Sequence, residues 1–166
     1  MKKLCLVMAF LACSFWMVGG VSAATYTQGL TVNATVASTG KLTISPTTIS
    51  FPDADPDVTD PIPANSTVSV SVKARVASGG SVTLTHKAAD DLKDGTKTIT
   101  IDNVTWTATG SGYNGSGTMN MTTDQNVGGW TGPGQYDGVL TYSLDNDWAY
   151  EPGSYTASTT FTLTTP

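Results

Sequence analysis

Cysteine is scarce in this chain of 166 residues, and the only two, Cys5 and Cys13, fall within residues 1–23. We interpret that segment as a signal peptide, so the exported chain should contain neither a thiol nor a disulfide. Exported domains are allowed disulfides, but this one has to rely on its hydrophobic core. A cysteine nucleophile is excluded for the same reason.

Residues 1–23 have the three parts of a secretory signal. Two lysines precede an apolar run of about fifteen residues, which is short for a transmembrane helix, and small residues follow. We predict cleavage before Ala24, or one residue later, and export by way of the periplasm to the cell surface or beyond. A lipoprotein anchored at Cys13 is the alternative, but it would leave apolar residues 15–18 exposed.

Basic residues are also few. The sequence has eight against thirteen acidic ones, and removal of the two signal lysines leaves six, a net charge of −7. Nucleic acids and anionic lipids are bound by clusters of Lys and Arg, so we expect neither as a partner. We also expect no membrane span after signal removal.

Good helix formers are few after the signal, where Thr, Ser, Val and Gly are frequent. Such a composition is typical of strands. Apolar residues recur at every second position, the period of a strand with one buried face. The stretches are 41–44, 49–51, 68–76, 82–84, 99–101, 140–144 and 155–163. We predict a single domain, residues 38–166, folded as an immunoglobulin-like antiparallel β-sandwich.

Three local predictions accompany this fold. Turn residues 78–80 and the alternation on both sides predict a hairpin over 67–86. The only helix candidate is 87–93. The Gly-rich stretch 109–138 should contain a weak strand around Met119 and Met121, because a structureless loop of that length is uncommon.

An alternating stretch also stands directly behind the signal, in residues 27–37. Its apolar residues are Leu30, Val32, Ala34 and Val36, with small polar residues between them. A strand at this place completes either its own sandwich or the sandwich of a neighbour. We therefore treat residues 24–37 as a candidate donor strand, distinct from the domain.

Residues suited to catalysis are scarce. The single histidine, His86, stands at a predicted strand end near Asp90 and Asp91, where we expect it to face solvent. No nucleophile elbow, phosphate loop or His-Glu-x-x-His motif accompanies it. We therefore expect no enzymatic activity, no catalytic residue and no cofactor.

Residues 52–65 are rich in proline and aspartate and are predicted to form a stiff acidic loop. The spacing Asp53-x-Asp55-x-Asp57 raises the question of calcium, because hard cations prefer carboxylate oxygens. The loop lacks a glycine after the third acid, and Ala64 stands where a closing glutamate would be. We expect a solvated acidic turn and no metal site.

Three tryptophans follow the signal. Trp106 has strand spacing and is predicted in the core, and Trp148 with Tyr150 is predicted to pack the end of the sandwich. Trp130 and Tyr136 lie in the Gly-rich stretch, where they form either an exposed platform for a sugar ring or an anchor for the loop.

Two stretches resemble the beginning and the end of spore coat protein U-type domains, the subunits of archaic chaperone–usher pili. The first is Gln28–Val36 followed by Leu42–Phe51, and the second is Gly153-Ser154-Tyr155 with Phe161-Thr162-Leu163. The cysteine pair usual in that family is absent. The ending is also similar to that of WxL surface domains, with Phe161 in place of their tryptophan.

The first resemblance implies assembly by donor-strand exchange. A periplasmic chaperone, and then the N-terminal strand of the next subunit at an outer-membrane usher, fills a groove left by a missing strand. Leu30, Val32, Ala34 and Val36 would be the inserted side chains. The hypothesis is a fimbrial subunit acting in adhesion and biofilm formation. The alternative is a self-contained secreted module that binds a protein or glycan and uses 27–37 as its own first strand.

Overall fold

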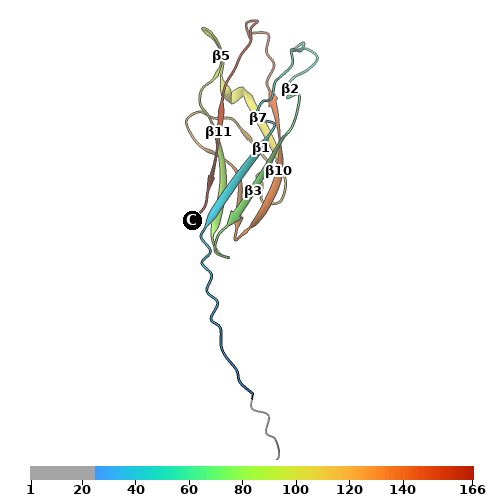
Figure 1. The fold of residues 1–166 in the computed structure, drawn as a ribbon. Coiled ribbons are helices and arrows are strands. Elements are labelled where there is room, and N and C mark those ends of the chain that lie inside the picture. The colour runs from blue at the N-terminus through green and yellow to red at the C-terminus, as the bar shows by residue number, and fades with distance from the viewer. Residues whose placement is uncertain (1–24) are drawn as a thin grey trace, which may run out of the picture. The chain divides into compact units, whose positions relative to one another are not determined.

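The computed structural model describes residues 25–166 (Figure 1). The predicted signal peptide and its cleavage site lie outside the described residues. The chain divides after Ala34 into two units, and the second, residues 35–166, contains all the strands found in the described part. Within residues 25–166 no helix is long and apolar enough to cross a membrane.

The strands are β1 (Thr39–Ser45), β2 (Ile62–Pro63), β3 (Val68–Arg75), β4 (Ser81–Ala88), β5 (Leu92–Asp94), β6 (Lys97–Ile99), β7 (Val104–Thr109), β8 (Ser116–Thr118), β9 (Gln125–Thr131), β10 (Gly134–Leu144) and β11 (Thr159–Thr164), with a short 3-10 helix η1 at Ile101–Asn103. Sheet A has the order β1-β3-β10-β7-β8, with β2 beside β10, and sheet B has the order β11-β4-β9. Strands β5 and β6 form a separate hairpin. Neighbouring strands pair antiparallel throughout. The predicted class, an all-β antiparallel sandwich, is confirmed.

Alternation along the strands builds the core between the two sheets. In β3 the apolar residues at every second position are buried and the residues between them point outward. β4 and β10 follow the same pattern, so Val72, Leu84 and Leu140 have no exposed surface. Each such fully buried side chain contributes roughly 1.5–3 kcal/mol. Trp106 is 2% exposed, which confirms its predicted place in the core.

The predicted hairpin over 67–86 is wrong. β3 belongs to sheet A and β4 to sheet B, and residues 76–80 carry the chain from one sheet to the other. Gly80 N donates to Ala77 O in this connection. Alternation reveals only that each strand buries one face. Two strands facing each other across a core therefore produce the same pattern as two strands paired side by side.

Other local predictions have mixed outcomes. Residues 87–93 form no helix, because β4 continues to Ala88 and β5 begins at Leu92. The expected turn at Asp94-Gly95 is confirmed, and it joins β5 to β6 with Gly95 at φ 62°. Residues 49–51 form no strand, although Ile49 and Phe51 pack half-buried against the core. The Gly-rich stretch 109–138 contains β8, β9 and the beginning of β10.

Residues 27–37 form no strand in the single chain. Leu30 is 87% exposed, Val32 80% and Val36 68%. A strand is stabilised by hydrogen bonds to a neighbouring strand and by burial of one face, and this segment has neither. The expectation that 27–37 is the domain's own first strand is therefore wrong for the isolated chain, and β1 begins later, at Thr39.

Candidate assembly site at the open edge of the sandwich

Both sheets end on the same side of the domain, at β1 and β11. β1 pairs only with β3, and β11 pairs only with β4. A Cβ atom placed on Gly40 of β1 would lie 3.1 Å from the side chain of Leu163 of β11, so the two strands lie side by side at this point. No backbone hydrogen bond joins them in the described part of the chain. Each strand therefore has one free row of N–H and C=O groups.

The opposite side of the sandwich is closed by backbone hydrogen bonds. Residues 110–115, which connect β7 with β8, lie against β9. Asn114 N donates to Val127 O at 2.8 Å, and Gly129 N donates to Gly112 O at 2.9 Å. This contrast identifies the side of β1 and β11 as the open edge of the sandwich.

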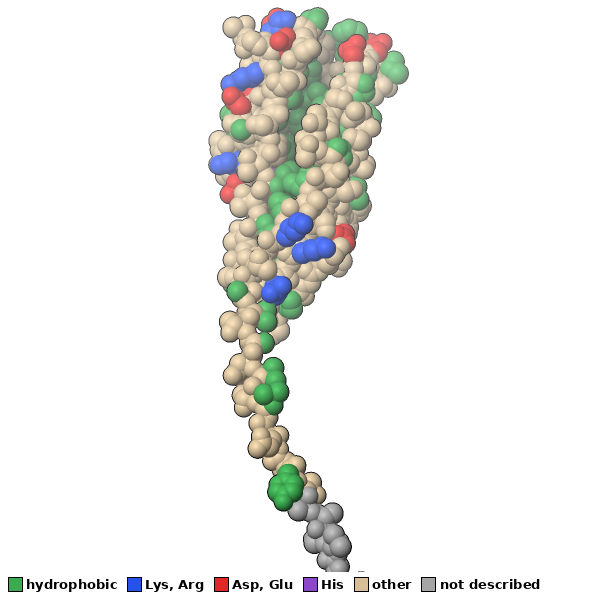
Figure 2. Space-filling view, viewed as in Figure 1, with side chains coloured by type: hydrophobic (Ala, Val, Ile, Leu, Met, Phe, Trp, Pro, Cys, Tyr) green, Lys and Arg blue, Asp and Glu red, His purple; other side chains and the backbone are tan. Residues whose placement is uncertain are grey.

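The core side chains at the open edge are only half-buried. They are Leu42 and Ile44 of β1 and Phe161 and Leu163 of β11. They have the same inward positions as Val70 and Val72 of the neighbouring β3, which are 1% and 0% exposed. Figure 2 shows hydrophobic side chains gathered along a hollow on this side. An added strand with an apolar residue at every second position would cover them.

The segment before the domain has this pattern. The side chains of Leu30, Val32 and Val36 alternate with polar residues and are largely exposed. Burial of three such side chains is worth roughly 5–9 kcal/mol. One chain thus contains an apolar row without cover and an apolar strand without a partner. This is the geometry on which the predicted donor residues depend.

His86 is fully buried, so the prediction of a solvent-facing histidine is wrong. Its ring lies between sheets, with ring centroids 5.1 Å from Trp106 and 5.3 Å from Phe161. Burial lowers the pKa of His86 to about 4, and its Nε2 atom has no partner. The sequence contained the signal, because His86 continues the inward positions of Val82 and Leu84 along β4.

The acids near His86 in sequence do not contact it. Asp90 accepts a hydrogen bond from Lys93, and Asp91 accepts one from the backbone of Ile101. The polar atom that His86 meets instead is the Tyr142 hydroxyl. A histidine held neutral among aromatic rings has the surroundings of a packing residue, and no nucleophile lies beside it to be activated.

Trp130 and Tyr136 do not form an exposed platform, so that prediction is wrong. Trp130 is 8% exposed and stacks on Tyr136 with ring centroids 4.9 Å apart. Its Nε1 donates to Ser111 O at 2.7 Å, and the Tyr136 hydroxyl donates to Gly132 O. The physical reason is the register of β9, which places Trp130 on the inner face. The pair anchors the loops at this end.

The acidic loop is attached to the segment after β10. Asp57 accepts a hydrogen bond from Trp148 Nε1 at 3.1 Å, and Asp60 accepts one from Asn146 N at 2.9 Å. Asp55 accepts one from the backbone within its own turn. Across residues 25–166 no three acidic, histidine or cysteine side chains converge as metal ligands do. Trp148 is 69% exposed, so the prediction that it packs the end of the sandwich is wrong.

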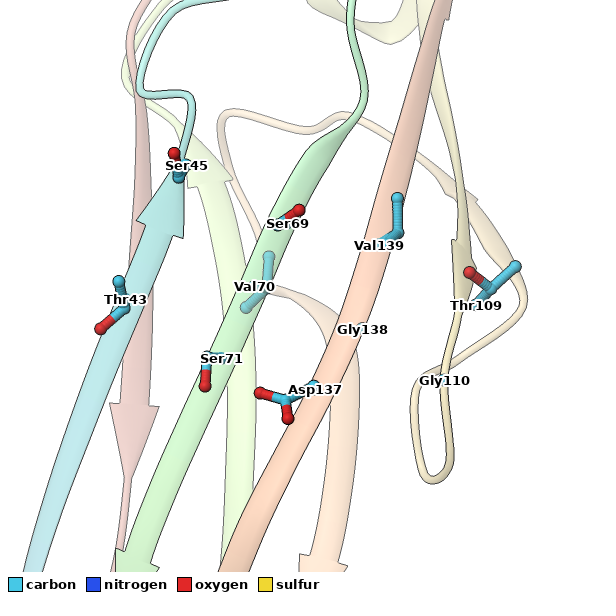
Figure 3. Close-up of a pocket in the computed structure, with 10 residues that line it drawn as sticks. All are labelled: Thr43, Ser45, Ser69, Val70, Ser71, Thr109, Gly110, Asp137, Gly138 and Val139. Carbon is cyan, nitrogen blue, oxygen red and sulfur yellow. The ribbon is translucent and has the colours of Figure 1, made fainter.

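A shallow pocket lies on the outer face of sheet A (Figure 3). Hydroxyl groups of Ser69, Ser71 and Thr43 line it together with the carboxylate of Asp137 and the backbone of Gly138. Hydrogen bonds from Ser71 and Gln135, with Lys73 nearby, lower the pKa of Asp137. The surface is polar and open, and it presents no nucleophile with an adjacent base.

No protein-family model matches the sequence, and no curated protein matches it either.

Proposed function

We propose that this protein is a structural subunit of a surface fibre, a fimbrium or pilus, that assembles by donor-strand exchange. Residues 24–37 of one copy insert along the open edge of the next, and Leu30, Val32, Ala34 and Val36 cover the half-buried side chains there. The observation that carries the proposal is the presence of both uncovered apolar rows in one chain.

Strand order supports an immunoglobulin-like domain with one strand missing. Immunoglobulin domains have sheets of order A-B-E-D and C-F-G. The order β1-β3-β10-β7 fits A-B-E-D in chain order, and β4-β11 fits C-F. The position of G, beyond β11, is empty in the described chain. That position is the open edge.

The partners follow from the same edge. Unpaired strand edges aggregate, so an exported subunit of this kind needs cover before assembly. A periplasmic chaperone supplies a temporary strand, and an outer-membrane usher is the place of exchange. The finished fibre, made of copies of this chain or related subunits, would serve adhesion and biofilm formation at the cell surface.

The donor strand is tested by Val32→Asp, with Thr31→Asp as the matched control. Val32 would enter the apolar row, where a charge is costly, whereas Thr31 would face away from it. We expect the wild type and Thr31→Asp to form ladders of increasing size on non-boiled gels. Val32→Asp should form none, yet it should shorten the ladder of the wild type, because it still accepts a strand.

The acceptor edge is tested by Ile44→Asp. This variant should donate its strand but accept none, so alone it forms no ladder. Mixed with Val32→Asp, it should give a single dimer band, because each variant supplies the half that the other lacks. A wild type that stays monomeric at every concentration, and whose melting is unchanged by a synthetic peptide of residues 25–38, would favour the self-contained module instead.

A further inference from the structure

Three of the six basic residues after the signal gather at one end of the domain, although the chain is acidic as a whole. They are Lys41 of β1 and Lys73 and Arg75 of β3, all exposed. Lys41 lies directly opposite Lys73 in the strand register, and Figure 2 shows the basic group on this surface. We call these three residues the basic end. Like charges placed opposite each other destabilise a strand pair, so this group has an unfavourable energy in the single chain.

The basic end has little compensation within its own copy. The ion pairs of the described residues, Lys93–Asp90 and Lys97–Asp94, involve other lysines. Asp137 is the carboxylate close to Lys73, and Lys73 contributes to the lowered pKa of that carboxyl. One carboxylate against three cations leaves a net positive surface.

The opposite end of the domain is acidic. Residues 46–66, which follow β1, and residues 145–154, which follow β10, contain no lysine or arginine. Their exposed acids, which we call the acidic end, are Asp53, Asp55, Asp57, Asp60, Asp145, Asp147 and Glu151. β1 runs from the basic end toward this end, and β10 begins opposite Ala74 and runs the same way. A seven-residue strand spans roughly 20 Å, so the two groups are well separated.

Two large hydrophobic side chains are exposed among these acids. Trp148 is 69% exposed and Val58 79%. Asp57 fixes the indole of Trp148 through its Nε1 atom. Tryptophan and arginine are frequent at the energetic centres of protein interfaces, and a guanidinium group is attracted to the face of an indole. The acidic end therefore has the chemistry of a docking surface for a basic protein surface.

The direction of strand donation brings the two ends together. Neighbouring strands of this domain pair antiparallel, and a donated strand that follows this rule runs opposite to β11. β11 ends near the basic end, because Thr165 lies against Gly40. Residue 37 of the donated strand therefore leaves the edge at the acidic end. The donor's own domain begins two residues later, with its basic end first.

We infer that the basic end of one copy docks on the acidic end of the next copy of this chain, with Arg75 and Lys73 against Trp148 and the surrounding carboxylates. The inference rests on the proposed function and adds a second contact to it. Complementary charge accelerates association and selects the partner. Parallel insertion would bring two basic ends together, so the same charges oppose it.

The experiment compares Arg75→Glu with Lys87→Glu in the full exported chain. Both variants change the charge by the same amount, but Lys87 in β4 lies outside the basic end. We expect the rate of ladder growth to fall about tenfold for Arg75→Glu and by less than about twofold for Lys87→Glu, since contact charges act mainly on association. Monomer melting should be similar for both.

Charge exchange tests the partner surface. Lys73→Glu with Arg75→Glu should slow growth strongly, and adding Asp53→Lys with Asp145→Lys to the same chain should restore it. Growth of the wild type should also slow between about 0.05 and 0.5 M salt, where screening shortens the range of charge interactions. This last measurement needs no variant to fold.

The outcomes separate the two proposals. Wild-type ladders that grow at the same rate with Arg75→Glu, or at all salt concentrations, overturn the charge contact and leave strand exchange standing. A wild type without ladders overturns strand exchange itself.

Discussion

The Nδ1 atom of His86 in β4 lies 3.4 Å from the hydroxyl oxygen of Tyr142 in β10, so a polar contact joins the two sheets inside the core. Tyr142 is 5% exposed, and burial also raises the pKa of its hydroxyl. Trp106 and Phe161 complete the surroundings of the imidazole. The charged groups that could stabilise a protonated His86 are absent from this ring of contacts.

The isolated domain should therefore lose stability in acid. The folded state holds the pKa of His86 at about 4, below the value of 6.5 for the unfolded chain, so the unfolded state binds the proton more tightly. Stability is fully present above pH 6.5 and falls as the pH drops from there to about 4, by about 3 kcal/mol in total. Denaturant unfolding at several pH values measures this loss. His86→Phe should remove it, and a variant with the same slope would contradict the assignment.

Tyr113 lies across the backbone of Gly138, and its hydroxyl donates to Val70 O and Tyr136 O. A Cβ atom on Gly138 would come 2.5 Å from the ring. Gly138→Ala should therefore destabilise the fold by about 1–3 kcal/mol through overpacking. Gly129→Ala is the control, because the nearest atom to its Cβ lies at 3.9 Å. Thermal unfolding of the two variants should differ clearly, and equal melting would show that the ring moves aside freely.

Tyr155 has the backbone partner predicted from the sequence, since its hydroxyl donates to Glu151 O at 2.7 Å. The side chain is half-buried. Tyr155→Ala should cost roughly 2–3 kcal/mol, less than a fully buried aromatic residue. Tyr155→Phe should cost about 1 kcal/mol, the value of one hydrogen bond. Chemical unfolding of both variants separates the packing from the hydrogen bond, and identical losses would assign the whole effect to the hydroxyl.

Trp148 and Trp106 should respond oppositely to truncation. Trp106→Ala removes a side chain that is 2% exposed and should cost about 3–5 kcal/mol. Trp148→Ala removes an exposed one and should change the free energy of unfolding by less than about 1 kcal/mol. In ladder assays Trp148→Ala should nevertheless slow growth. A large loss of monomer stability in this variant would mean that the indole supports the acidic loop rather than an interface.

Much of the fold could be predicted from alternation alone. The strands around Val70, Leu84 and Tyr142 lie where the period of two places them. The pairing of β3 and β4 could not be predicted, because the period does not state whether two buried faces share a sheet or face each other. The 3-10 helix and β2 are too short to leave a pattern.

The donor segment and the open edge differ in how far the sequence could reveal them. Leu30, Val32 and Val36 could be identified from their spacing, but their exposure in the single chain needed coordinates. The half-buried state of Ile44 and Phe161 depends on which strands are edges, and therefore on topology. Trp130 was misplaced because glycines around it suggest a loop, whereas they make room for the indole within β9.

The open edge also has a mechanical consequence. A strand donated along β11 lies parallel to the long direction of the sheets, so a pull along the fibre would load its hydrogen bonds in shear, all at the same time, rather than one after another. Resistance to stretching would then increase with the number of paired residues. A fibre built this way could bear tension without any covalent link between its copies, which suits an exported chain that has no cysteine after residue 13.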